Sequence, residues 1–229
     1  MDSLGLQPEK ALAPQSRAAL EDLAACQRIR EDFYLAGSAG LSLYLGHRSW
    51  AGLDFMAPAN RLTPQKRRDL LGELLALGAE TQVETARDGY LYARFGGVNT
   101  RFFYYPYPLI APEEQIAGMA VASLADLGLM KVAAIISRGT RRDFIDLYLL
   151  CRHLPLEDLL AVAPNKFGHV RDFPLQALKG LADLSCAEGE PMPRLDLPVD
   201  WQEVEDWARR EVRRLGRIHV GLPASPDGS

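Results

Sequence analysis

The order of its segments constrains the fold of this chain most, because every segment that has a strand-like pattern lies in the first half. Two short apolar runs, 33–36 and 53–56, fit buried strands, and three longer strand-like runs follow at 80–85, 90–95 and 98–104. An Asp-Gly pair and a Gly-Gly pair separate the last three runs. Glycine turns of this kind predict an antiparallel meander.

Helical patterns precede, separate and follow these strands. The expected helices cover 14–30, 39–45, 63–78, 123–137, 141–153, 156–163, 173–185 and 201–217. Thr63-Pro64 is typical of a helix start, with threonine at the N-cap and proline at the first helical position. After Pro112 the sequence is helical almost throughout, apart from a proline-rich extended connection at 188–200. The later strands lack crossover helices, which argues against a Rossmann fold.

We therefore predict an α+β (α/β) protein with a mixed β-sheet core and a C-terminal helical lobe. The core with its N-terminal helix is expected at 1–110, the lobe at 111–222 and a disordered tail at 223–229. No apolar run approaches the roughly 18 residues of a membrane span, and the first ten residues lack the apolar stretch of a signal peptide. We expect a cytoplasmic protein with no membrane partner. The formal net charge is −4, so a nucleic-acid partner would need a local basic patch.

Two polar features in the first half could carry chemistry. Gly37-Ser38 joins a strand to a helix, and a helix N-terminus offers unpaired N–H groups to a phosphate. The alternative is an ordinary turn with an N-cap. Asp54 lies between Leu53 and Phe55 on the next strand, where it is either an edge-strand charge or a placed ligand. One helix and a short loop separate the two features, which places them at the same end of neighbouring strands.

A third feature lies in the second half. On a continuous helix, five side chains would fall within a stripe of about 80°: Lys131, Ile135, Arg138, Arg142 and Asp146. Gly139 is expected to break or bend that helix. The alternative is a solvated face with ion pairs, including Arg142 to Asp146.

Several motifs in this order resemble a known family. They are Leu35 to Leu41 (LAGSAGL), Leu45 to Arg48 (LGHR), Gly52 to Met56 (GLDFM), Tyr105 to Leu109 (YPYPL), Asp126 to Leu149, Glu190 to Pro193 (EPMP) and Val199 to Val204 (VDWQEV). The chain resembles the AbiEii/AbiGii-type nucleotidyltransferases, toxin components of bacterial toxin–antitoxin and phage-abortive systems. The resemblance spans roughly 33–212, and the block from Lys131 to Leu149 is its most specific part.

The resemblance implies a site and a reaction. Gly37 and Ser38 would hold the phosphates of an NTP, and Asp54 would bind Mg²⁺ or Mn²⁺. Lys131 would offset triphosphate charge, and Asp146 would be a further catalytic acid. The roles of Arg48, Arg138 and Arg142 would be to contact phosphate or to fix Asp146, whereas His47 is expected to be a structural turn residue. The nucleotide would pass to RNA (tRNA, for example) or to a protein, and a cognate antitoxin is an implied partner.

The chain departs from the family at one carboxylate. The paired D-x-D motif reads Gly52-Leu53-Asp54 here, and the strand 98–104 carries Asn99 and Arg101 in place of a third acid. Paired carboxylates hold the two metal ions of many phosphoryl-transfer sites. Three hypotheses stay open: an active transferase, a catalytically silent relative that binds nucleotide or a protein partner in the same cleft, and rescue of the site by Asp126. All assume that the Gly-Ser turn, Asp54 and the charged stripe converge on one pocket.

Overall fold

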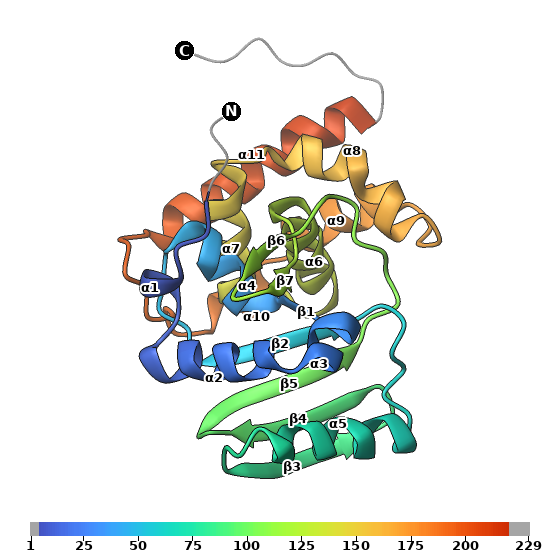
Figure 1. The fold of residues 1–229 in the computed structure, drawn as a ribbon. Helices are drawn as coiled ribbons and strands as arrows, with labels where there is room; N and C mark the ends of the chain where they lie inside the picture. The colour runs from blue at the N-terminus through green and yellow to red at the C-terminus, as the bar shows by residue number, and fades with distance from the viewer. Residues whose placement is uncertain (1–4, 220–229) are drawn as a thin grey trace. The chain divides into compact units, whose positions relative to one another are not determined.

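The computed structural model describes residues 5–219, and the predicted tail at 223–229 lies outside the described residues. The chain divides into two compact units, of which one ends at Ser123 and the other begins at Leu124 (Figure 1).

The first unit is built on a seven-stranded mixed sheet, which confirms the predicted fold class. In the order β3-β4-β5-β2-β1-β7-β6, its strands are Thr81–Arg87, Tyr90–Phe95, Val98–Tyr104, Gly52–Ala57, Tyr34–Ala36, Met119–Val121 and Glu114–Ile116. The β3-β4-β5 meander is antiparallel, as the glycine turns predict. β2, which carries Asp54, pairs antiparallel with β1 and parallel with β5.

Helices accompany this sheet: α1 (Pro8–Ala11), α2 (Pro14–Ala25), α3 (Gln27–Asp32), α4 (Gly37–Leu45) and α5 (Pro64–Ala76). Figure 1 shows α2, α3 and α5 on one side of the strands. The predicted helix 14–30 is interrupted, because the extended backbone of Cys26 separates α2 from α3. The predicted start of α5 is confirmed, since the Thr63 hydroxyl accepts a hydrogen bond from the Lys66 N–H at 3.4 Å.

The expectation of helix after Pro112 is wrong for residues 114–121. This segment forms the β6–β7 hairpin, and Val121 of β7 pairs parallel with Leu35 of β1. Each of these strands has only three residues, which is too short for a period-2 pattern to be recognised.

The second unit is helical: α6 (Leu124–Ser137), α7 (Arg141–Cys151), α8 (Leu156–Phe167), α9 (Phe173–Ala182), α10 (Ser185–Glu188) and α11 (Trp201–His219). Gly139 has φ +54° and separates α6 from α7, as the sequence predicts. The predicted helix 173–185 is divided at Asp183 into α9 and α10. α11 is strongly amphipathic and buries Val204, Trp207 and Ala208.

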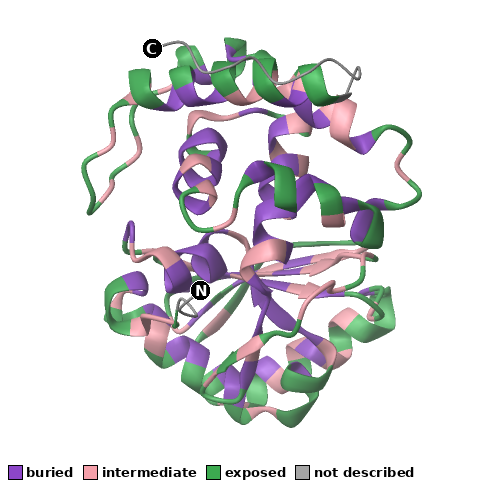
Figure 2. Ribbon diagram, turned by 90° about the horizontal axis from the view of Figure 1, so that it is seen from above, coloured by how far each residue is buried: buried purple, intermediate pink, exposed green. Residues whose placement is uncertain are grey.

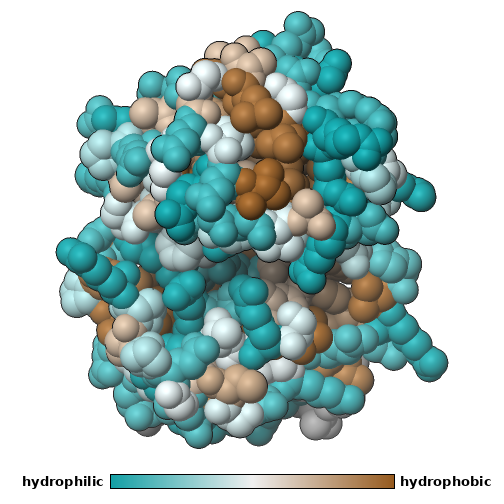
Figure 3. Space-filling view, turned by 90° about the horizontal axis from the view of Figure 1, so that it is seen from below, coloured by the Kyte–Doolittle hydropathy of each residue, from teal (hydrophilic) through white to brown (hydrophobic). Residues whose placement is uncertain are grey.

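Burial follows these patterns. Buried residues lie along β1, β2, β4, β5 and β7 and on one face of most helices, whereas β3 is largely exposed (Figure 2). The surface shown in Figure 3 is mostly hydrophilic, with hydrophobic side chains gathered in small areas. Among residues 5–219, no helix combines the length and the apolar character that crossing a membrane requires.

Candidate functional site

Gly37 and Asp54 lie against each other in the first unit. Ala36 at the end of β1 is the register partner of Asp54 on β2, and α4 begins at Gly37 with φ +61°. A Cβ atom at Gly37 would lie only 2.7 Å from Asp54 Oδ2. Glycine is therefore needed here both for the left-handed backbone and for the close approach of the carboxylate. The predicted proximity of the Gly-Ser turn and the strand aspartate is confirmed.

Ser38 lies in the first turn of α4 and is buried, with 9% of its surface exposed. The first N–H groups of a helix have no partner within the helix, and they carry the positive end of its dipole. The nine-residue α4 thus presents N–H donors beside the Asp54 carboxylate. Phosphate oxygens and a metal-binding carboxylate oxygen could be accommodated together at this point.

Arg101 is the residue that the sequence did not connect with Asp54. It is the register partner of Asp54 on β5, and its Nη1 lies 3.1 Å from Asp54 Oδ1. The two side chains are 34% and 15% exposed. The Arg101 guanidinium also lies over the Tyr92 ring, 5.4 Å from its centroid. The sequence showed only that an acid is missing from this strand, because the parallel β2–β5 register cannot be read from local patterns.

The donor set around Asp54 fits one divalent cation better than two. Mg²⁺ binds through one or two carboxylates together with substrate phosphates and several waters, which suits a single aspartate. A two-metal clamp needs shared carboxylates, but Gly52 supplies none, and Asp54 already accepts from Arg101. Among the described residues there is no group of three or more His, Cys, Asp or Glu side chains that could hold a metal ion.

His47 and Arg48 follow the end of α4 and are both buried, with 0% and 2% of their surface exposed. The Arg48 guanidinium lies 4.9 Å from the centroid of the Trp50 ring. Its expected contact with phosphate therefore stays a prediction that would require Arg48 to become accessible. The position of His47, directly after the left-handed Gly46 that ends α4, agrees with a structural turn residue.

In the second unit, Lys131 joins two carboxylates. Its Nζ lies 2.6 Å from Asp146 Oδ2 and 3.3 Å from Asp143 Oδ1. Both aspartates are fully buried, and Lys131 is 6% exposed. The alternative of a solvated charged face is wrong for Lys131 and Asp146. The other two cations of the stripe reach solvent, since Arg142 is exposed and the Arg138 side chain is 61% exposed.

Asp143 is a central member of this network that the stripe did not include. Arg138 donates to it through Nε at 2.8 Å and Nη2 at 2.9 Å, and the Thr140 hydroxyl donates at 2.6 Å. Burial alone would raise the pKa of Asp143, but the hydrogen bonds from Arg138 and the charge of Lys131 hold the pKa below its ordinary value. The sequence could have indicated this contact, because Thr140 and Asp143 have the spacing of an N-cap residue and its partner in the first helical turn.

Asp126, a possible replacement for the missing carboxylate, forms an ion pair within the second unit. Its Oδ1 lies 2.7 Å from Lys166 Nζ, and both side chains are fully buried. This ion pair does not favour rescue of the site by Asp126, which stays a prediction.

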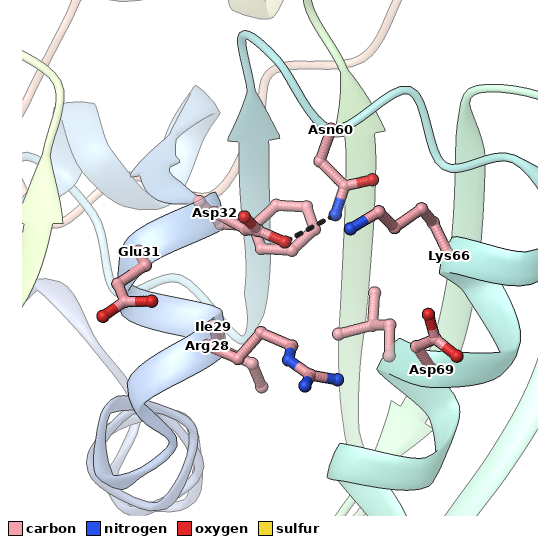
Figure 4. Close-up of a pocket in the computed structure, with 9 residues that line it drawn as sticks. Arg28, Ile29, Glu31, Asp32, Asn60, Lys66 and Asp69 are labelled. Carbon is pink, nitrogen blue, oxygen red and sulfur yellow. Dashed lines mark hydrogen bonds between the residues drawn. The ribbon is translucent and has the colours of Figure 1, made fainter.

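Figure 4 shows a separate cavity of about 270 Å³ in the first unit, between α3 and α5. Its polar lining includes Asp32, Asn60 and Lys66, and Asn60 donates to Asp32 Oδ2 at 2.7 Å. Neither Ser38 nor Asp54 lines it.

The candidate residues thus form two groups, each assembled within its own unit. The first contains Gly37, Ser38, Asp54 and Arg101, and the second contains Lys131, Arg138, Asp143 and Asp146. That the two groups serve one pocket stays a prediction.

Comparisons with known proteins relate the chain to a described family. The chain is 29% identical over 212 residues to the uncharacterized protein aq_aa25 of Aquifex aeolicus (strain VF5), covering 89% of this chain and 97% of that protein. A structure from H. pylori assigned as a nucleotidyltransferase shares the fold, with a TM-score of 0.52 and 18% identity over 89% of this chain and 94% of that one. JHP933 from Helicobacter pylori gives a TM-score of 0.44 at 15% identity, with 91% and 100% covered. The family model described as the nucleotidyl transferase AbiEii toxin of type IV toxin–antitoxin systems matches residues 18–206. Because this match covers most of the sequence, the chain belongs to the AbiEii family of nucleotidyltransferases.

Proposed function

We propose that this protein transfers a nucleotide from a Mg²⁺- or Mn²⁺-bound NTP to RNA or to a protein, as the toxin of a toxin–antitoxin system. One observation carries the proposal: the left-handed turn at Gly37 sets the Asp54 carboxylate against the N-terminus of α4. Donors for phosphate and an acceptor for a cation thereby lie side by side. Family membership supports a cognate antitoxin as a partner, and the cytoplasm, where NTPs and RNA are available, as the compartment.

In the proposed reaction, an acceptor hydroxyl attacks the α-phosphorus of the NTP. A new bond forms between the hydroxyl oxygen and the α-phosphorus, the bond from the α-phosphorus to the bridging oxygen of the β-phosphate breaks, the hydroxyl proton passes to solvent, and pyrophosphate leaves. The N–H groups of α4 and the Ser38 hydroxyl bind the phosphates, while Asp54 binds the cation. A bound Mg²⁺ would supply charge neutralisation at the phosphates.

The remaining roles follow from the chain's other charged groups. Arg101 balances the charge of Asp54. Its guanidinium also offers positive charge to an incoming triphosphate, in addition to the N-terminus of α4. By the family resemblance, Lys131 offsets triphosphate charge and Asp146 is a supporting acid. Asp143 holds Arg138 and Lys131 in place from within the same network.

Labelled NTPs test the proposal directly. Purified protein is incubated with each labelled NTP, with Mg²⁺ or Mn²⁺, and with total RNA and cell protein. We expect label in RNA or protein, and a loss of about 10²–10³-fold in rate for Asp54→Ala. Asp22→Ala is the matched control, because Asp22 is an exposed acid on α2. The proposal fails if wild type transfers no label with either metal, or if Asp54→Ala transfers as fast as wild type.

A second candidate function is nucleotide binding without transfer. It is favoured by the absence of a carboxylate at Gly52 and by the ion pair between Arg101 and Asp54. Saturable binding of a non-hydrolysable NTP, weakened by Asp54→Ala and accompanied by no transfer, would support this function over the first.

A further inference from the structure

The face of the sheet that carries Asp54 continues as a row of polar and aromatic side chains. The register partner of Asp54 on β5 is Arg101, and the partner of Arg101 on β4 is Tyr92. Register partners in a sheet point to the same face. On either side of this row lie the β4–β5 pairs Tyr90–Phe103 and Arg94–Asn99. These residues are exposed or half-buried, whereas the alternating β4 residues are buried.

Aromatic rings and guanidinium groups alternate on this face. Tyr90 and Phe103 have ring centroids 5.0 Å apart at an interplanar angle of 44°. The Arg87 guanidinium lies 5.0 Å from the centroid of the Tyr90 ring, in addition to the contact of Arg101 with Tyr92. The Tyr92 hydroxyl donates to Asn99 Oδ1 at 2.9 Å, which fixes the ring on the sheet.

Arginines on this face lie beside acids and aromatic rings. Three arginines (Arg87, Arg94 and Arg101) lie near two acids. Asp54 contacts Arg101, and Glu84 lies 3.9 Å from Arg94, whose side chain is 53% exposed. Arg87 lies over the Tyr90 ring. These arginines are the positive groups on this face that the phosphates of a nucleic acid could contact.

We propose that this face binds single-stranded RNA, which deepens the proposed function by naming RNA as the acceptor class. We call it the Tyr–Arg face: Arg87, Tyr90, Tyr92, Arg94, Asn99, Arg101 and Phe103. Unpaired bases stack on aromatic rings and arginine planes, and arginines hold the phosphates between them. The row ends at Asp54, so a bound strand runs along the sheet to the candidate nucleotide site within the first unit.

Fluorescence anisotropy with a labelled single-stranded oligouridylate of about 12 nucleotides tests this proposal, with a duplex of equal length as comparison. No NTP or metal is added, so the binding result does not depend on whether transfer occurs. Tyr90→Leu/Tyr92→Leu removes both rings, and Tyr90→Phe/Tyr92→Phe keeps them. The leucine variant should weaken binding by roughly 5- to 150-fold for each stacked base that loses its ring, and the phenylalanine variant by about 2-fold at most.

The electrostatic part has its own matched pair of variants. Arg87→Gln/Arg94→Gln should reduce the slope of log K against log salt by about 0.7 for each phosphate that an arginine no longer neutralises. Arg210→Gln/Arg213→Gln removes two exposed arginines of α11 and should leave binding and slope unchanged.

Folding of each variant is checked by circular dichroism before binding is measured. The proposal is overturned if the oligonucleotide does not bind saturably, if the duplex binds as tightly, if the leucine and phenylalanine variants behave alike, or if only the α11 variant loses affinity. Transfer of label to protein in place of RNA would also overturn it. RNA binding that persists in a protein without transfer activity would support the Tyr–Arg face and refute the proposed transferase alone.

Discussion

Replacing Gly37 by alanine perturbs the contact on which the candidate nucleotide site depends. An alanine in the left-handed conformation, here φ +61°, costs about 1–2 kcal/mol. Its Cβ would also lie 2.7 Å from Asp54 Oδ2, a separation that real Cβ atoms do not show. Asp54 must therefore move, which disturbs its ion pair with Arg101. For a partly exposed pair, that adds up to about 1 kcal/mol.

Gly78→Ala is the matched control. Gly78 has φ +79°, and a Cβ added there would meet no atom within 4 Å, so only the backbone cost remains. In a chain of this size, 1 kcal/mol changes Tm by about 2–4 °C. Gly78→Ala should therefore lower Tm by about 2–8 °C, and Gly37→Ala should lower it further, by at most about 4 °C.

Two assays separate stability from function in this pair. Scanning fluorimetry gives Tm, and calorimetric titration with a non-hydrolysable NTP and Mn²⁺ gives affinity at a temperature where both variants are folded. Gly37→Ala should lose most of its nucleotide affinity, while Gly78→Ala keeps that of wild type. If the two variants lower Tm equally and Gly37→Ala keeps the wild-type affinity for nucleotide, the assignment of this turn to nucleotide binding is refuted.

Three further variants test other parts of the structure. Gly52→Asp restores the second carboxylate, with its Cβ 3.3 Å from the Asn99 carbonyl oxygen, and should raise Mn²⁺-dependent label transfer by up to about 10²-fold. Asp143→Asn should cost about 1.5–3 kcal/mol at neutral pH, measured by urea unfolding. Folding lowers the pKa of Asp143, so its contribution to the free energy of unfolding is present above about pH 4 and is lost as pH falls through the folded pKa. Below about pH 4, the free energy of unfolding of Asp143→Asn should therefore change less with pH than that of wild type. Lys166→Met leaves the buried Asp126 without this partner and should cost about 3–5 kcal/mol in urea unfolding, most of it recovered by Asp126→Leu/Lys166→Met.

Local chemistry made much of the fold predictable. Thr63 as an N-cap, the glycine turns of the meander and the break at Gly139 each act within a few residues, and the structure confirms all three. The proximity of Gly37 and Asp54 was also predictable, because a strand–turn–helix–strand order leaves few arrangements. The β6–β7 hairpin was not, since its strands are short and its parallel pairing with β1 joins segments far apart in sequence.

The candidate site was less predictable, since its contacts depend on long-range register and burial. Arg101 meets Asp54 across 47 positions of sequence, through a parallel pairing that no periodicity reveals. The charged stripe placed Asp146 on the same face as Lys131, although the ion pair that it suggested for Asp146 was with Arg142. It included Asp146 but not Asp143, because α7 begins a new helix after Gly139 and changes the angular relation between the two segments.

The charges around Asp54 determine whether the site can bind the nucleotide or the metal ion first. Gly52 and Asp54 share one face of β2, and their neighbours on β5 are Asn99 and Arg101. A pair of carboxylates here would concentrate negative charge and attract two divalent cations, but the pair of Asp54 and Arg101 is neutral as a whole. With the N-terminal dipole of α4 beside it, a neutral pair favours an incoming polyanion over a free cation. Nucleotide should therefore bind as the metal complex or ahead of the metal. Gly52→Asp adds a carboxylate beside this neutral pair and makes the local charge negative before the nucleotide binds. The variant should therefore have a higher affinity than wild type for Mn²⁺ in the absence of nucleotide.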